Sequence, residues 1–201
     1  MAESTSLMHG QFYHVFNRGN NGEDLFLEVR NYQHFLNLYA KHIYPIAETY
    51  AYCLLKNHFH ILVRIKTPEE IEETLKVSET LRVFTSPSQQ FSNLFNAYTK
   101  AINKAYQRTG SLFEHPFHRI EIANEGHFLR LITYIHRNPQ KHGFVEDFRK
   151  WPHTSYRAFV SQQPTRIARD IVLELFGGMK GFVEAHQYED ESDLISSLVL
   201  E

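Results

Sequence analysis

The chain has 201 residues, of which 42% are hydrophobic, a formal net charge of −2 and a single cysteine. This length and apolar content suffice for one globular unit with a buried core, and the near-neutral charge excludes a general polycation. No apolar stretch approaches the length of a membrane span, and residues 1–10 lack the charged-then-apolar pattern of a signal peptide. We therefore expect a cytoplasmic protein that does not insert in a membrane, with Cys53 as a buried thiol.

The charges are unevenly distributed along the chain. Residues 90–160 carry ten Lys/Arg and five Asp/Glu, whereas residues 161–201 carry three and eight. Cations interspersed with aromatic side chains, as in 90–160, are typical of surfaces that bind single-stranded nucleic acid, but also of a solvated helix face above ordinary core aromatics. The candidate DNA contacts in this segment are Lys100, Lys104, Arg108, Arg119, Arg130 and Arg137.

The first third of the chain predicts three strands and one helix. A turn-rich stretch follows the first strand, and Pro45 ends the helix. The second and third strands are joined only by Lys56 and Asn57, which predicts a tight antiparallel hairpin. The predicted strands are Phe12–Phe16, Ile46–Leu55 and His58–Ile65, and the helix contains Tyr32–Tyr39.

The remaining chain predicts further helices and a fourth strand. The segment up to residue 122 predicts a short helix at 69–77, a mobile loop at 86–88, a helix through Phe91–Ala105 and a strand at Phe117–Ile122. A further helix should begin after the N-cap Asn124 and end near Asn138, because Pro139 disfavours helical geometry in the residue before it. Helical segments at 167–176 and 182–187 and an apolar tail at 194–200 follow. This order predicts an α+β domain over residues 1–160, with helices packed on a ferredoxin-like antiparallel sheet. A mainly helical, acidic extension follows over residues 161–201, either as a dimer contact or as a cover over the basic surface.

The most informative motif is His58-Phe59-His60 at the start of the third strand. Alternate residues of a strand point to opposite faces, so both imidazoles should face the same side, away from Phe59 and Ile61. Such a pair supplies half of a metal site. Because the chain has 13 histidines, an isolated pair of this kind is more often structural or incidental.

A second group of candidates lies on the helix that begins after Asn124. Its apolar residues recur at i, i+3, i+4 and i+7, and this spacing places His127, Tyr134 and Asn138 together on the adjoining stripe. Alone, Tyr134 could be a boundary tyrosine and Asn138 a helix C-cap. With the two histidines they supply two imidazole nitrogens, an amide oxygen and a phenol, a set suited to metal-assisted attack on a phosphodiester with Mg²⁺ or Mn²⁺.

Four ordered motifs, together with the opening Tyr13–Gly19, resemble the single-tyrosine HUH transposases, and among them the REP-associated tyrosine transposases. The similarity covers residues 10–160. The motifs are Asn57–Val63, Gly110–Phe113, Tyr134–Pro139 with Lys141–Gly143, and Trp151–Tyr156. Lys56 stands where members of that family commonly have proline, which alters the hairpin turn but leaves the two histidines in place.

The resemblance implies a transposase, a metal-dependent DNA endonuclease that cleaves and rejoins single-stranded DNA next to hairpins. His58 and His60 match the metal ligands, Tyr134 matches the nucleophile that becomes a 5′-phosphotyrosine, and Asn138 matches the third ligand. The residues themselves add His127 as a proton carrier and Lys141 as a phosphate contact. The partner would be single-stranded or hairpin DNA, with Tyr134 acting on its own subunit or across a homodimer, and the DNA-bound protein would lie at the nucleoid.

Two other classes of function fit parts of the sequence. One is a non-catalytic regulatory protein that binds hairpin DNA, in which the histidine pair is a remnant. The other is a hydrolytic metalloenzyme without a covalent step, against which the lack of a carboxylate at a matched ligand position counts. A metal titration distinguishes the non-catalytic DNA-binding protein from the metal-dependent enzyme.

Overall fold

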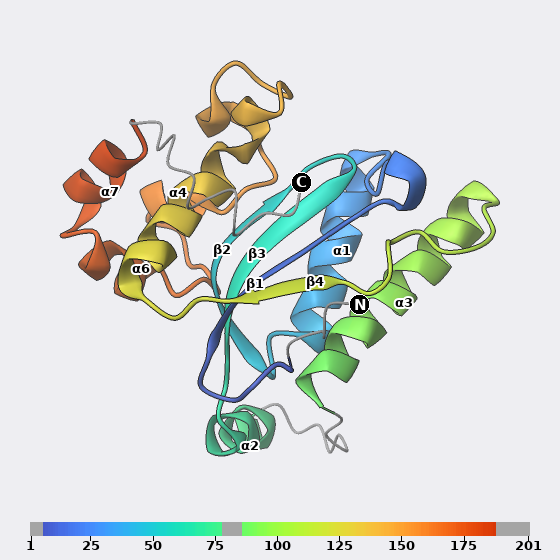
Figure 1. The fold of residues 1–201 in the computed structure, drawn as a ribbon, viewed down its shortest axis with the longest axis horizontal. Helices are drawn as coiled ribbons and strands as arrows, with labels where there is room; N and C mark the ends of the chain where they lie inside the picture. The colour runs from blue at the N-terminus through green and yellow to red at the C-terminus, as the bar shows by residue number, and fades with distance from the viewer. Residues whose placement is uncertain (1–5, 78–85, 188–201) are drawn as a thin grey trace.

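A computed structural model describes residues 6–77 and 86–187. Four strands form one antiparallel sheet in the order β2-β3-β1-β4 (Figure 1). They are β1 (Phe12–Arg18), β2 (Ala47–Leu54), β3 (His58–Ile65) and β4 (His118–Glu121). The predicted hairpin of β2 and β3 is present, and β1 pairs with both β3 and β4. The α+β fold with a ferredoxin-like sheet is therefore confirmed.

Helices cover both faces of the sheet (Figure 1). On one face α1 (Val29–His42) and α3 (Pro87–Tyr106) pack side by side, and α4 (Glu125–Lys141) lies across the other. The smaller elements are η1 (Asn20–Gly22), α2 (Pro68–Val77), η2 (Phe148–Lys150), α5 (Tyr156–Val160), α6 (Arg169–Leu175) and α7 (Met179–Ala185). No helix among the described residues is long and apolar enough to cross a membrane.

Strand alternation divides the core into two layers. Phe59, Ile61 and Val63 point towards α1 and α3, whereas Leu62 packs with Ile132 of α4 on the opposite face. All five side chains are at least 98% buried. Because residues one apart in β3 face opposite layers, the position of each histidine is fixed by the packing of its neighbours.

Two of the differences from the sequence prediction lie at the ends of helices. α4 does not stop at Asn138 but continues through Pro139 to Lys141. Asn138 and Pro139 are buried there, and the amide of His142 donates to the Asn138 carbonyl at 3.0 Å, so packing and a last-turn hydrogen bond outweigh the steric preference of a residue before proline. The loop predicted at 86–88 instead begins α3, with Ser86 as N-cap and Pro87 in the first turn, a position that proline tolerates.

The first part of the acidic extension packs on the α4 face of the sheet. The amide of Ala168 donates to the Thr49 carbonyl at 2.9 Å, which attaches the extension to the edge strand β2. Val172 of α6 and Phe182 of α7 are fully buried in the core layer that contains α4. The predicted apolar tail at 194–200 lies outside the described residues.

Candidate active site

The two histidines of β3 point to the α4 face of the sheet, as their alternation with Phe59 predicts. His60 is 2% exposed and His58 is half-buried. Their rings are nearly perpendicular, with centroids 5.2 Å apart. Both imidazoles therefore meet the layer in which α4 lies.

α4 brings Tyr134 and Asn138 to these histidines. The Tyr134 and His60 ring centroids are 5.6 Å apart with planes at 82°, and Asn138 Oδ1 lies 3.3 Å from His58 Nε2. Lys141, one turn further on, places its ammonium 5.1 Å from the Tyr134 ring centre. Residues of one strand, β3, and one helix, α4, thus supply all five side chains.

The hydrogen bonds of the histidines leave their Nε2 atoms directed at the site. His60 Nδ1 bonds to His14 Nε2 at 3.0 Å, while its buried Nε2 has no hydrogen-bond partner among the described residues. His58 Nδ1 lies 2.8 Å from Asn57 Oδ1, an acceptor, which favours a proton on Nδ1. His58 Nε2 and the Asn138 oxygen are then two hydrogen-bond acceptors that face each other. A cation bound between them would make this contact favourable.

Charge and spacing also suit a divalent ion. Burial, followed by the charges of neighbouring histidines and Lys141, holds the pKa of His60 well below its ordinary value, so the ring is neutral near pH 7 and can offer a lone pair. Adjacent ligands of an octahedral Mg²⁺ at about 2.1 Å lie about 3 Å apart. The described residues contain no group of three His, Cys, Asp or Glu that could hold a metal. The Asn138 amide oxygen, 3.3 Å from His58 Nε2, is placed to be a third donor beside the two histidines.

A cleft of about 770 Å³ opens the histidines to solvent. Its walls come from η1, the β2–β3 turn and the segment before β4, with Asn20, Asn21, Glu114 and His118 among the lining residues. The one arginine in the wall, Arg18, donates from Nε to Glu114 at 2.8 Å. The cleft is therefore polar but nearly neutral, and most of its lining groups can hydrogen-bond to a ligand.

No family model matches the chain. It is 27% identical over 121 residues to a Haemophilus influenzae protein whose name provisionally assigns it to the REP-associated tyrosine transposases. That match covers 60% of this chain and 64% of the relative, so the chain spans less than two thirds of the relative's length. A solved structure of a REP-associated tyrosine transposase bound to a REP hairpin has a similar fold, with a TM-score of 0.60, 17% identity and coverage of 84% of this chain and 92% of that one. The resemblance to the REP-associated tyrosine transposases is confirmed.

The motifs that carry this resemblance meet in space, although they are far apart in the sequence. Asn20 donates from its amide to the Leu112 carbonyl at 2.9 Å, joining η1 to the Gly110–Phe113 motif. The Trp151 indole donates to the Leu54 carbonyl at 2.9 Å, and Ser155 Oγ lies 2.7 Å from His136 Nε2. The last motif therefore supports both the β2–β3 hairpin and the helix that bears Tyr134.

Two histidines beside the site were missed by the sequence analysis. His14 of β1 contacts His60, and the His142 ring centroid lies 4.8 Å from that of His58. His14 lies in the matched opening Tyr13–Gly19, but nothing in that stretch indicated a contact with the histidine pair. Only the strand register, which pairs His14 with Leu62 and Phe16 with His60, brings it next to the histidine pair.

The predicted proton carrier His127 does not join the site. Its ring lies 3.1 Å from the Asn124 side-chain nitrogen at the start of α4, and its backbone amide donates to the same side chain. Seven residues separate it from Tyr134, which is about 10 Å along a helix. Helical periodicity correctly indicates that His127 and Tyr134 lie on the same side of α4, but it does not show that they are two turns apart along the helix.

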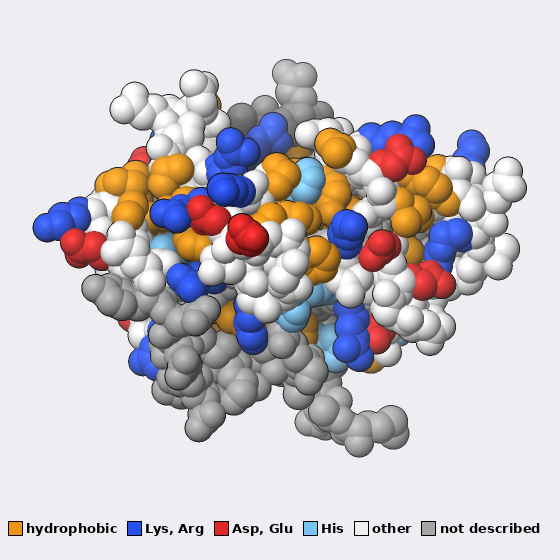
Figure 2. All heavy atoms as spheres, turned by 90° about the horizontal axis from the view of Figure 1, so that it is seen from above, with side chains coloured by type: hydrophobic (Ala, Val, Ile, Leu, Met, Phe, Trp, Pro, Cys, Tyr) orange, Lys and Arg blue, Asp and Glu red, His pale blue; other side chains and the backbone are white. Residues whose placement is uncertain are grey.

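The predicted DNA contacts are distributed over both sides of the sheet. Lys100 and Lys104 are exposed on α3, whereas Arg130 and Arg137 lie on α4 and Arg119 on β4. Arg108 forms an ion pair with Glu23, and Arg137 donates to the His186 carbonyl at 2.7 Å. On the face in Figure 2, Lys and Arg side chains are scattered among hydrophobic and acidic ones and form no continuous stripe.

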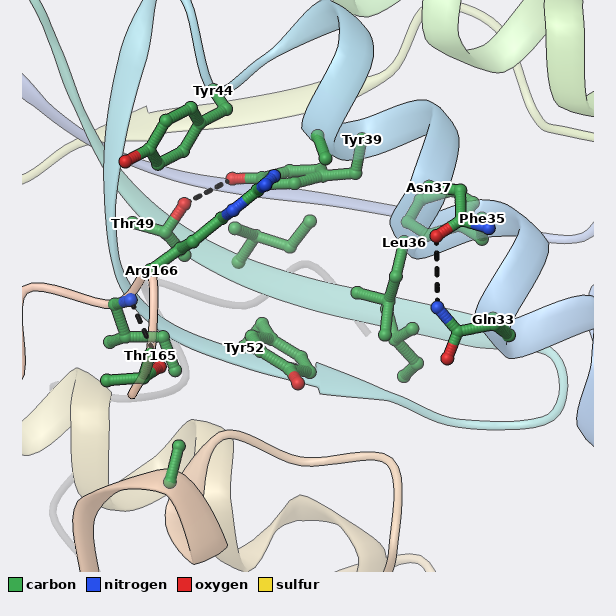
Figure 3. Close-up of a pocket in the computed structure, with 15 residues that line it drawn as sticks. Gln33, Phe35, Leu36, Asn37, Tyr39, Tyr44, Thr49, Tyr52, Thr165 and Arg166 are labelled. Atoms are coloured by element: carbon green, nitrogen blue, oxygen red, sulfur yellow. Dashed lines mark hydrogen bonds between the residues drawn. The ribbon is translucent and has the colours of Figure 1, made fainter. Parts of the chain in front are cut away.

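A second cavity, of about 350 Å³, lies on the far face of the sheet between α1, β2 and residues 165–167 (Figure 3). Tyr39, Thr49, Tyr52 and Arg166 line it, and the Tyr39 and Thr49 hydroxyls lie 2.8 Å apart. Phe35 and Ile61, which also line it, belong to the core beneath α1 and α3. This cavity is therefore separate from the histidine pair.

Proposed function

We propose that the protein is a metal-dependent transposase that cleaves and rejoins single-stranded DNA next to hairpins, with Tyr134 as nucleophile. The observation that carries the proposal is the convergence of Tyr134 and Asn138 on the histidine pair, with the two contacts of 5.6 and 3.3 Å. The similarity to REP-associated tyrosine transposases in sequence and fold supports the same reading. Hairpin DNA as substrate is taken from the solved relative's bound ligand.

His58, His60 and Asn138 would hold Mg²⁺ or Mn²⁺, which when bound polarises the scissile phosphate. The Tyr134 phenol loses its proton, and its oxygen attacks the phosphorus. The bond from phosphorus to the 3′ oxygen breaks, and the released oxygen takes up a proton to give a 3′ hydroxyl and a 5′-phosphotyrosine. The ammonium of Lys141, 5.1 Å from the Tyr134 ring centre, lies where it can stabilise negative charge that develops on the reacting groups.

The test is covalent trapping. We expect a labelled single strand that carries a hairpin, incubated with Mg²⁺ or Mn²⁺, to become linked to the wild-type protein and to release an end with a 3′ hydroxyl. Tyr134→Phe removes only the reacting oxygen and should abolish the adduct while hairpin binding persists. Tyr106→Phe is the matched control, because that tyrosine ends α3 and bonds to Glu28 at 2.8 Å, away from the histidines.

Two results would overturn the proposal. An adduct that persists in Tyr134→Phe would exclude Tyr134 as the nucleophile. The second result is a protein that binds the hairpin-bearing strands of the host genome but cleaves none of them in the presence of metal. That result would identify a non-catalytic regulatory DNA-binding protein.

A further inference from the structure

His14 is a fully buried histidine of the opening stretch Tyr13–Gly19, to which the sequence analysis assigned no role. It lies on β1, its Nε2 is 3.0 Å from His60 Nδ1, and the two rings are nearly coplanar, with centroids 5.1 Å apart and planes at 23°. Near coplanarity is the geometry of a hydrogen bond within the plane of both rings. Phe16 stacks on His14 at 4.7 Å and fixes its orientation.

The proton in this bond decides what His60 can bind. A neutral imidazole has one N–H and one lone pair. If His60 Nδ1 donates to His14, its Nε2 presents a lone pair to the site. If His14 donates instead, Nε2 carries the proton and cannot bind a cation.

We propose that His14 is a positioning residue that accepts the Nδ1 proton of His60 and so holds the His60 Nε2 lone pair towards the metal. The inference rests on the proposed function for the identity of His60 as a ligand. A histidine that binds a metal through one ring nitrogen commonly donates the N–H of its other ring nitrogen to a hydrogen-bond acceptor. Loss of that acceptor lowers metal affinity about 10- to 100-fold. Here the partner is a second histidine from the neighbouring strand.

The experiment measures Mn²⁺ binding by calorimetry in four variants and the wild type. His14→Phe keeps an aromatic ring but has no acceptor, and should weaken binding about 10- to 100-fold. His14→Gln retains an amide oxygen that can accept the proton, and should stay within a few-fold of the wild type. His34→Phe is the matched control, because His34 stacks on Tyr98 at 6.0 Å beneath the opposite face of the sheet.

A second readout uses the metal-free protein. Imidazole ¹⁵N shifts should show His60 protonated at Nδ1 in the wild type and in His14→Gln, and should change in His14→Phe. A proton on His60 Nε2 in the wild type, or unaltered Mn²⁺ affinity in a folded His14→Phe, overturns the role of His14. Binding that also survives His60→Ala would refute the proposed metal site itself, so the two failures can be distinguished.

Discussion

Acid should destabilise this protein through a histidine far from the cleft. His186 ends α7 and is 1% exposed. Its Nδ1 lies 2.7 Å from the Phe182 carbonyl, which can only accept, so the proton is on Nδ1. Its Nε2 then accepts from His136 Nδ1 at 2.8 Å, and His136 Nε2 lies 2.7 Å from Ser155 Oγ. A second proton on His186 would place two N–H groups face to face.

The size of the effect follows from the pKa of His186. Burial lowers that pKa from 6.5 to about 4, against an opposing contribution from the Phe182 carbonyl, and the charge of Arg137 lowers it further. Between these two values the unfolded chain binds more protons than the folded chain, so the free energy of unfolding falls as the pH falls. Linkage gives a loss of about 2 kcal/mol at pH 5 and about 3 kcal/mol at pH 4, relative to pH above 7.

His186→Gln tests this in urea, with the fluorescence of Trp151, the only tryptophan, as the probe. Glutamine can accept from His136 but does not titrate. We expect the variant to be about 1 kcal/mol less stable than the wild type at pH 7, for the lost hydrogen bond, and to equal or exceed it at pH 5. An equal loss of stability from pH 7 to pH 5 in wild type and His186→Gln would refute the reasoning.

Three further predictions concern the site and the DNA surface. Asn138→Ala should weaken Mn²⁺ binding less than His60→Ala does, because an amide oxygen is the weaker ligand; calorimetry measures both. Lys141→Ala should slow adduct formation at a fixed pH, and Lys141→Arg should restore the rate; the time course of covalent trapping measures both. Arg130→Ala, one turn before Tyr134, should reduce the slope of log K against log[salt] by about 0.7, whereas Lys100→Ala on the opposite layer should leave it unchanged.

The sequence predicted those features that local pattern determines. Alternation of polar and apolar residues in β3 predicted which face His58 and His60 share, and the helical stripe predicted that Tyr134 and Asn138 are neighbours. The motif resemblance then connected the strand with the helix. The boundary at Asn138 failed because tertiary packing of Asn138 and Pro139 outweighs a local backbone preference.

Features that depend on register or on distant contacts could not be predicted in this way. His14 reaches His60 only because β1 pairs with β3 in one particular register, and a shift of one residue would move it to the opposite face. His127 shows the converse limit. Periodicity gives the angle of a residue around a helix, but the approach of α4 to the sheet decides which turn meets the histidines.

The acidic extension gives the last argument, because charge alone offered only a dimer contact or a cover over the basic surface. Its described part contributes Val172, Phe182 and His186 to the core layer that includes α4, and the His186 carbonyl accepts from Arg137. His136, which is hydrogen-bonded to His186, lies between Tyr134 and Asn138 in the sequence of that helix. Residues 161–187 therefore support the rear of the candidate site through α4, and a surface charge count could not show this because the contacts are made by buried, mostly apolar side chains.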